Sequence, residues 1–542
     1  MRLRAAVAVM MFASSALGSA QQHPRDAEIH DADTLGWWHT TEALSNDSMQ
    51  GRDTGTAAYQ RAADLVAKRF AVAGLKPAGE RGTYFQSVPM HEIDLTPEGT
   101  SFTVVRGDGT RLPLQFLEEI TTGPSRTMLT HGEGVLSFRG YCGAEAMSDI
   151  AGKIILCFGT QRQGLPSGAE RLANARKGGA LGIVNIDDPY FTIEPPRWPY
   201  AYARSVTLTE PGHTQIASAP GSMLPAMRLS AAAFAKLLNG TGRDAAAILK
   251  TGGAQGTLEP FDLPARLDVT LHTTEKDISS PNVLAVLPGA DPALRDQYVV
   301  VAAHLDGYGF GTPVMGDNLY NGTLDDAAYV ALLIQMAEDL QAGKDLPPGA
   351  NAPSKQGSPS VKGTVLSPPK RSILFCAFTG EEKGLLGSTW FVEHPTVPVA
   401  QLAADVNLDQ LRPLFPLKIL TALAIHDTTL GAPATQVGAG MGIALREDRE
   451  PERGLLRRAD HYPFLKAGVP AIGFVFGFDP GTDAEQRYRH WYEVQYHRPQ
   501  DDLTQPVNFE AAAKFDAFFY RLVETVADDP ERPRVLSPIG KP

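Results

Sequence analysis

Residues 298–306 have the sequence YVVVAAHLD, an apolar run that ends in His304 and Asp306. Its β-branched and small residues predict a buried strand, and the Ala-rich stretch 326–341 predicts a helix after it. Similar apolar runs predict further strands at 282–287, 373–378, 403–408 and 471–476. Strands that alternate with helices predict an α/β fold with a mostly parallel central sheet flanked by helices.

Polar side chains follow these predicted strands at the point where each one ends. His304 follows the first, Glu381 and Glu382 follow the strand at 373–378, and Asp409 follows the strand at 403–408. Asp325 stands just before the predicted helix. Because sites in open α/β sheets form outside the carboxyl ends of the strands, we expect these side chains to lie close together.

The residue types in this set are those of a metal-dependent hydrolase. Zinc takes imidazole nitrogen and carboxylate oxygen at roughly 2.0–2.2 Å, and paired metals about 3.5–4 Å apart stabilise a hydrolytic transition state. His497, in the segment YHRPQD over 496–501, supplies the second imidazole. Asp306 is predicted as an outer carboxylate that orients the His304 ring.

Glu381 and Glu382 are adjacent, so their side chains point in different directions. We assign Glu382 as a metal ligand and Glu381 as the general base, which takes a proton from the attacking water and passes it to the leaving amine. Two roles stay open. Asp326 either belongs to the site or caps the following helix, and the Tyr496 hydroxyl either donates to the developing oxyanion or simply packs.

Length and composition narrow the classes of protein. A chain of 542 residues predicts two domains or a large insertion. The net charge of −12 disfavours a nucleic-acid partner. After the N-terminus the sequence has no apolar stretch long enough to predict a membrane span. Of the three cysteines, Cys376 is predicted as a buried core residue, whereas the pairing of Cys142 with Cys157 stays open.

The N-terminus has the features of a secretory signal. Arg2 and Arg4 precede an apolar run to about Leu17, and small residues follow before polar Gln21. This order predicts a signal peptide over 1–20. We therefore expect an exported protein, periplasmic or secreted.

The fragments HLD, NGTLDD, TGEE, NLD and YHRPQD, in this order, resemble the M28 family of zinc peptidases, whose best-known members are aminopeptidases. Residues 52–88, 450–454 and 460–470 resemble other segments of the family. The stretches DIAGK at 149–153 and NARKGGALG at 174–182 resemble a protease-associated (PA) domain, which is rich in β-strands.

The resemblance implies a division of the chain and a ligand set. Residues 21–124 would begin the catalytic domain, 125–258 would form the inserted PA-like domain, and 259–530 would complete the catalytic domain, with a surface loop at 343–369 and a tail at 531–542. Two Zn²⁺ ions are implied, although Co²⁺ or Mn²⁺ would suit the same ligands. The implied ligands are His304, Asp325 and Asp409 for one ion, and Asp325, Glu382 and His497 for the other.

The predicted function is that of an exported dinuclear zinc exopeptidase acting on peptides, foremost an aminopeptidase. One alternative is a carboxypeptidase that binds a substrate carboxylate, for which the candidate arginines are Arg446, Arg449, Arg453, Arg457 and Arg458. A glutaminyl-cyclase-like enzyme and a receptor-like relative without catalysis are the others. Side-chain preference and oligomeric state stay open.

Overall fold

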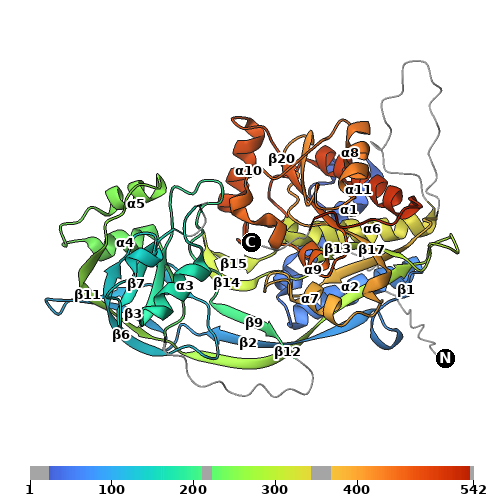
Figure 1. The fold of residues 1–542 in the computed structure, drawn as a ribbon. Coiled ribbons are helices and arrows are strands. Elements are labelled where there is room, and N and C mark those ends of the chain that lie inside the picture. Colours follow the sequence, from blue (N-terminus) through green and yellow to red (C-terminus); the bar gives the residue numbers. More distant parts are fainter. Residues whose placement is uncertain (1–22, 160–161, 163, 210–222, 344–367, 538–542) are drawn as a thin grey trace, which may run out of the picture.

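The computed structural model describes residues 23–159, 162, 164–209, 223–343 and 368–537 (Figure 1). The predicted signal peptide at 1–20, most of the loop predicted at 343–369 and the last five residues of the predicted tail at 531–542 lie outside the described residues. None of the helices in these ranges is long and apolar enough to cross a membrane.

The larger of two main sheets in the described chain has ten strands, and its middle carries the sequence YVVVAAH. Its order is β19 (Ala444–Arg446), β18 (Ile419–Leu423), β20 (Ala471–Gly477), β17 (Leu402–Asn407), β13 (Tyr298–His304), β16 (Ser372–Phe378), β12 (Thr273–Leu287), β2 (Phe85–Leu95) and β9 (Arg204–Leu208), with β1 (Lys76–Pro77) paired to β12. The four strands β20, β17, β13 and β16 are parallel, as predicted. The strands on either side of these four pair with them in antiparallel fashion, so the sheet as a whole is mixed.

Both faces of this sheet are buried, which explains why its central strands are apolar without alternation. Along β13, Val299 and Val301 belong to the core on one face, and Val300 belongs to the core on the other. The first face is covered by α1 (Ala32–Ser45), α2 (Ala57–Ala73), α6 (Ala328–Ala342), α8 (Gly431–Gly440) and α11 (Phe509–Asp528). The second is covered by α7 (Leu386–Glu393) and α9 (His461–Lys466).

The ends of the helices follow local sequence signals. The Thr56 side chain accepts a hydrogen bond from Tyr59 N at the start of α2. Gly74 ends α2 and Gly343 ends α6, both in the left-handed conformation that glycine adopts without a steric penalty. The helix predicted from the sequence at 326–341 is thus present with small shifts of its ends.

The second main sheet has eight strands in the described chain. Its order is β4 (Arg111–Leu114), β3 (Ser101–Arg106), β11 (Phe261–Thr270), β6 (His131–Phe138), β7 (Ile154–Phe158), β8 (Gly182–Ile186), β10 (Met227–Leu229) and β5 (Ile120–Thr122). Its larger core includes side chains of α4 (Ala231–Leu238) and α5 (Ala245–Gly253), and its smaller core includes α3 (Gly168–Lys177). We call this sheet and its helices the smaller unit.

The smaller unit is wider than the predicted insert at 125–258. Strands β3, β4 and β5 precede that range and β11 follows it, yet all four belong to the second sheet. Conversely, β9 lies inside the range but pairs with β2 of the larger sheet. No local marker in the sequence reveals these boundaries, because they depend on pairing between distant strands. The long strands β2 and β12 lead from one sheet towards the other (Figure 1).

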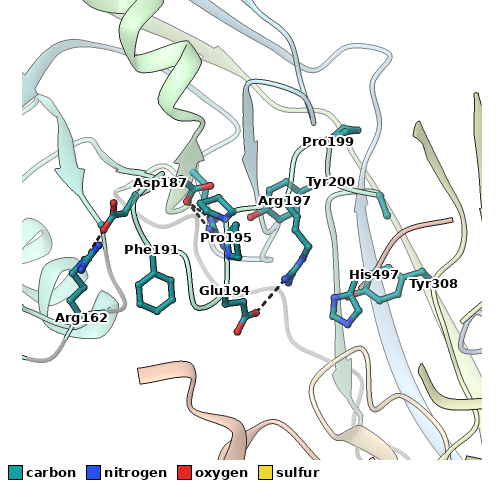
Figure 2. Close-up of a pocket in the computed structure, with 15 residues that line it drawn as sticks. Arg162, Asp187, Phe191, Glu194, Pro195, Arg197, Pro199, Tyr200, Tyr308 and His497 are labelled. Atoms are coloured by element: carbon teal, nitrogen blue, oxygen red, sulfur yellow. Dashed lines mark hydrogen bonds and ion pairs between the residues drawn. The ribbon is translucent and has the colours of Figure 1, made fainter. Parts of the chain in front are cut away.

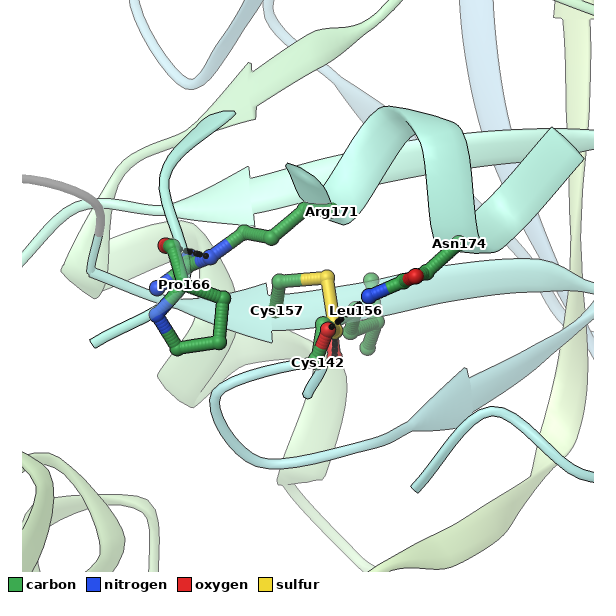
Figure 3. Close-up of a disulfide and its surroundings, with 6 residues drawn as sticks. All are labelled: Cys142, Leu156, Cys157, Pro166, Arg171 and Asn174. Carbon is green, nitrogen blue, oxygen red and sulfur yellow. Dashed lines mark hydrogen bonds between the residues drawn. A yellow bond between two sulfur atoms is a disulfide. The ribbon is translucent and has the colours of Figure 1, made fainter. Parts of the chain in front are cut away.

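A disulfide joins Cys142 to Cys157 in the smaller unit (Figure 3). Both residues are fully buried in the core that also contains Ala175 of α3. The link closes a loop of 15 residues, a length for which chain entropy corresponds to about 3 kcal/mol of stabilisation. The third cysteine, Cys376, is buried in β16 as predicted.

Candidate metal centre

The side chains predicted as metal ligands meet at the carboxyl ends of β13, β16 and β17, around Asp325. Asp325 Oδ1 lies 3.4 Å from His304 Nε2, and Asp325 Oδ2 lies 3.4 Å from His497 Nε2. Glu382 Oε2 lies 3.3 Å from the same His497 nitrogen. Asp409 forms a group with His304 and Asp326 in which one potential ligand atom of each lies within 4.8 Å of the others.

These distances fit metal ligation. Two ligand atoms of a tetrahedral zinc ion, each about 2.1 Å from the metal, lie about 3.4 Å apart. His304 Nε2 and Asp325 Oδ2 are buried, and neither has a hydrogen-bond partner among the described residues. Since the two oxygens of Asp325 face different imidazoles, this carboxylate has the geometry of a bridge between two cations.

The electrostatics of the cluster also favour cations. Burial, followed by repulsion from Asp325, raises the pKa of Glu382 well above its usual value. Burial and the charge of Asp409 do the same to the pKa of Glu381. Burial also works to raise the pKa of Asp325, but Arg412 and the two imidazoles hold it well below its usual value. Crowded, buried carboxylates of this kind are stabilised by bound cations.

Each imidazole is oriented by a partner on its second nitrogen. His304 Nδ1 lies 3.1 Å from the carbonyl oxygen of Asp306, and His497 Nδ1 lies 2.9 Å from the Tyr308 hydroxyl. When Nδ1–H donates to these oxygens, Nε2 keeps its lone pair and faces Asp325. Burial lowers the pKa of His497 to about 4, so its ring is neutral at pH 7.

Asp306 therefore acts differently from the prediction, because its carbonyl rather than its carboxylate meets the imidazole. The carboxylate oxygen Oδ1 is 3.9 Å from His304 Nδ1. It instead accepts a hydrogen bond from Glu381 N at 3.1 Å, while Oδ2 accepts one from the Thr54 hydroxyl at 2.9 Å. Asp306 thus fixes the backbone of Glu381.

Asp326 does not cap α6. The residue at the N-cap is Ala327, which makes no side-chain cap. Asp326 Oδ2 accepts a hydrogen bond from His304 N at 3.2 Å. Its side chain thus connects the helix start to the end of β13.

Glu381 and Tyr496, predicted as catalytic groups, both lie beside the ligands. Glu381 Oε2 is 3.9 Å from His304 Nε2, and the Glu381 side chain is 9% exposed. The Tyr496 ring packs against His497 with centroids 3.7 Å apart. The Tyr496 hydroxyl accepts a hydrogen bond from Arg458 Nη2 at 3.1 Å, which leaves its own proton able to donate.

Three residues near the centre received no role from the sequence. Fully buried Arg412 places Nη2 3.1 Å from Asp325 Oδ1. Asp501 accepts hydrogen bonds from the backbone nitrogens of Leu324 and Asp325 at 2.9 and 3.1 Å. Tyr308 supports His497 as described. Arg412 follows Asp409 by three residues and Asp501 follows His497 by four, so proximity to a ligand was the available signal.

A cavity of about 230 Å³ adjoins the centre and connects it to the smaller unit (Figure 2). Tyr308 and His497 form one end of its lining. Most of the remaining lining comes from the segment 187–201, which we call the wall loop, together with Arg162 and Arg228. The sequence did not predict that the smaller unit reaches the ligands.

Comparison with known families agrees with this geometry. Residues 282–523 match the family model described as Peptidase family M28, and this range contains every proposed ligand and Glu381. Over residues 282–523 the chain is thus similar to peptidase family M28. The smaller unit lies almost wholly outside the matched range.

The chain is similar to several known proteins over part of their length. It is 25% identical over 266 residues to a "Probable zinc metalloprotease" of Pyrenophora tritici-repentis (43% of this chain, 54% of the relative). It is 28% identical over 139 residues to "Aminopeptidase YwaD" of Bacillus subtilis (25% and 28%). The chain thus spans about half or less of the length of these relatives.

A solved structure covers more of the chain. The aminopeptidase from Aneurinibacillus sp. strain AM-1 aligns over 94% of this chain and 96% of its own, with a TM-score of 0.56 and 18% identity. At this identity the match concerns the fold, including the smaller unit.

Proposed function

We propose that this chain is a dinuclear zinc exopeptidase of the M28 kind, foremost an aminopeptidase that removes N-terminal residues from peptides. The observation that carries the proposal is the bridging geometry of Asp325, whose two oxygens face His304 and His497 at 3.4 Å each. One ion would be held by His304, Asp325 and Asp409, and the other by Asp325, Glu382 and His497. Co²⁺ or Mn²⁺ would suit the same ligands.

When bound, the two ions would polarise the scissile carbonyl and activate water. Glu381 is the proposed general base. Asp306 fixes its backbone, and its carboxylate, 9% exposed, lies 3.9 Å from His304 Nε2. It would accept a proton from the attacking water and deliver it to the nitrogen of the leaving amine. Tyr496, whose hydroxyl proton is able to donate, is the proposed contact for the substrate oxygen that becomes negative.

The experiment is a substrate panel on the purified, zinc-loaded chain. It compares aminoacyl anilides, amino-blocked peptides with a free carboxyl end, and peptides with N-terminal glutamine. Hydrolysis of the anilides that stops with a chelator and returns with zinc supports the proposal. Cleavage confined to amino-blocked peptides would identify a carboxypeptidase, and cyclisation without hydrolysis would identify a glutaminyl-cyclase-like enzyme.

We also propose that the chain is exported and that the smaller unit is a PA-like domain bordering the active site. The Cys142–Cys157 disulfide supports export, since such bonds persist in oxidising compartments. N-terminal sequencing of the protein recovered from the producing cell's exterior or periplasm tests the first proposal. A mature chain that starts after residue 20 is expected, and an intact Met1 on cytosolic protein would contradict it.

A further inference from the structure

The cavity beside the metal centre has a distinctive charge distribution. Two of its arginines have partners of their own within the smaller unit: Arg162 Nε lies 2.7 Å from Asp188, and Arg228 Nη2 lies 2.6 Å from Asp187. In Figure 2, Arg162 and Asp187 lie on the side of the cavity away from Tyr308 and His497.

The third arginine of the lining, Arg197, pairs with a carboxylate that also contacts two other arginines. Glu194 lies 2.8 Å from Arg458 Nη1, 3.4 Å from Arg453 Nε and 3.3 Å from Arg197 Nη1. Burial alone would raise the pKa of Glu194, but Arg458, Arg197 and Arg453 lower it to about 2. One carboxylate therefore faces three guanidinium groups.

The surrounding acids do not remove this excess of positive charge. Arg453 has one more carboxylate nearby, Glu450 at 3.9 Å, and Glu450 also pairs with Arg489. Among the described residues, Glu194 is the one acid within ion-pair distance of Arg197, and the Arg197 side chain keeps 20% of its surface exposed. The unbalanced charge therefore lies on the cavity side of the cluster, at Arg197.

Arg197 is also placed next to the reacting centre. Its guanidinium carbon lies 4.5 Å from the centre of the Tyr496 ring, and that ring packs directly on the proposed ligand His497. Figure 2 shows the Arg197 side chain extending from the wall loop between Glu194 and His497. A substrate held at the metals would therefore extend past Arg197 when it enters the cavity.

We infer that this cavity binds a carboxylate of the peptide substrate and that Arg197 is the residue that selects it. The inference rests on the proposed peptidase function and adds the substrate class. A planar guanidinium matches a carboxylate with two parallel hydrogen bonds, whereas the ammonium group of a peptide would be repelled there. The carboxylate comes either from an acidic side chain or from the free carboxyl end of a short peptide.

Two matched pairs of peptides, assayed on the zinc-loaded full chain, test the inference and separate the two sources. The first pair is Leu-Ala and Leu-Ala-amide, which differ in the terminal carboxylate. The second is Leu-Glu-amide and Leu-Gln-amide, which differ in the side chain. We expect kcat/KM to be about 10- to 100-fold higher for the carboxylate-bearing member of at least one pair, the range for a charge-assisted hydrogen bond.

The substitution Arg197→Gln should bring that ratio close to one, and Arg197→Lys should restore part of it. Arg228→Gln is the matched control, because it removes the same charge from the same cavity but from an arginine paired with Asp187; its ratio should stay as in the wild type. Equal rates within both pairs in the wild type, or an unchanged ratio in Arg197→Gln, would overturn the inference while leaving the peptidase proposal standing. If the wild type cleaved none of the four peptides and no member of the anilide panel, the proposed function would fail, and this inference with it.

Discussion

Buried carboxylates lie both at the metal centre and in the wall loop, but their surroundings differ. Around Asp325, burial and mutual repulsion raise the pKa values of Glu381, Glu382 and Asp409. In the wall loop, three arginines hold the pKa of the equally buried Glu194 at about 2. The carboxylates of the metal centre therefore need cations from solution, whereas the charge of Glu194 is neutralised by arginines of the chain itself, which leave positive charge over at Arg197. The same residue type thus marks a binding site on one side and a structural contact on the other.

The largest effect is expected at the residue shared by both proposed metals. Asp325→Ala removes the bridging carboxylate, so both ions should be lost and turnover should fall by about 10⁴-fold or more, beyond the loss of a single catalytic group. Metal content per chain and anilide hydrolysis are the measurements. Asp317→Ala, which removes an exposed carboxylate from β15 (Asp317–Tyr320), is the control and should keep both ions. Full metal content in Asp325→Ala would contradict the bridging role.

A change in the wall loop should affect stability rather than metal content. Glu194→Gln leaves buried arginines without their anion and should destabilise the fold by roughly 3 kcal/mol at pH 7. Because the folded-state pKa of Glu194 is depressed to about 2, its contribution is complete above about pH 4.5 and is lost as the pH falls towards 2. The difference in the free energy of unfolding between the variant and the wild type should therefore be smaller at pH 3 than at pH 7.

The control for this experiment is Glu133→Gln, which breaks an exposed pair with Arg266 and should change stability by less than about 1 kcal/mol. Denaturant unfolding at both pH values gives the comparison. If the free energy of unfolding of Glu194→Gln differed from that of the wild type by the same amount at pH 7 and pH 3, charge pairing would not be the cause of the destabilisation.

The smallest effect is expected at a partner of a ligand. Tyr308→Phe removes the hydroxyl that lies 2.9 Å from His497 Nδ1, and loss of such a partner weakens metal affinity by about 10- to 100-fold. We expect the lower end, for one of the two ions, in a competitive zinc titration. Tyr320→Phe serves as the control because its hydroxyl donates to the Thr312 carbonyl instead. Unchanged affinity for both ions in Tyr308→Phe would show that the Tyr308 hydroxyl does not support metal binding by His497.

The comparison also explains what the sequence could and could not reveal. The strand ending in His304 and the acids after neighbouring strands could be predicted, because strand-end position and residue type are local features of the chain. The match of residues 282–523 to the M28 family model confirms the resemblance inferred from those fragments. The β-sheet partners of the smaller unit and the approach of Glu194 to Arg453 and Arg458 could not be predicted. The pairing of β11 with β3 and β6 and the contacts of Glu194 join segments more than 100 residues apart that share no motif.

The roles of single atoms were also beyond the sequence. Asp306 was correctly placed beside His304, but its carbonyl rather than its carboxylate meets the ring. The position of Arg412 three residues after a ligand did not reveal its role, because an arginine there is as consistent with a surface turn as with a buried contact to Asp325. Such details depend on the backbone path at the strand ends, which residue type alone does not fix.

The central claim is that two adjacent glutamates have different roles, and one paired measurement tests it most directly. Metal content and the rate of anilide hydrolysis are determined together, in one buffer, for Glu381→Ala and Glu382→Ala. Glu381→Ala should keep both ions and lose about 10²–10⁴-fold or more in turnover, because a missing base leaves the metal site filled. Glu382→Ala should lose one ion as well as activity. If Glu381→Ala lost the metal while Glu382→Ala kept it, the two roles would be reversed, and wild-type activity in both variants would contradict this site altogether.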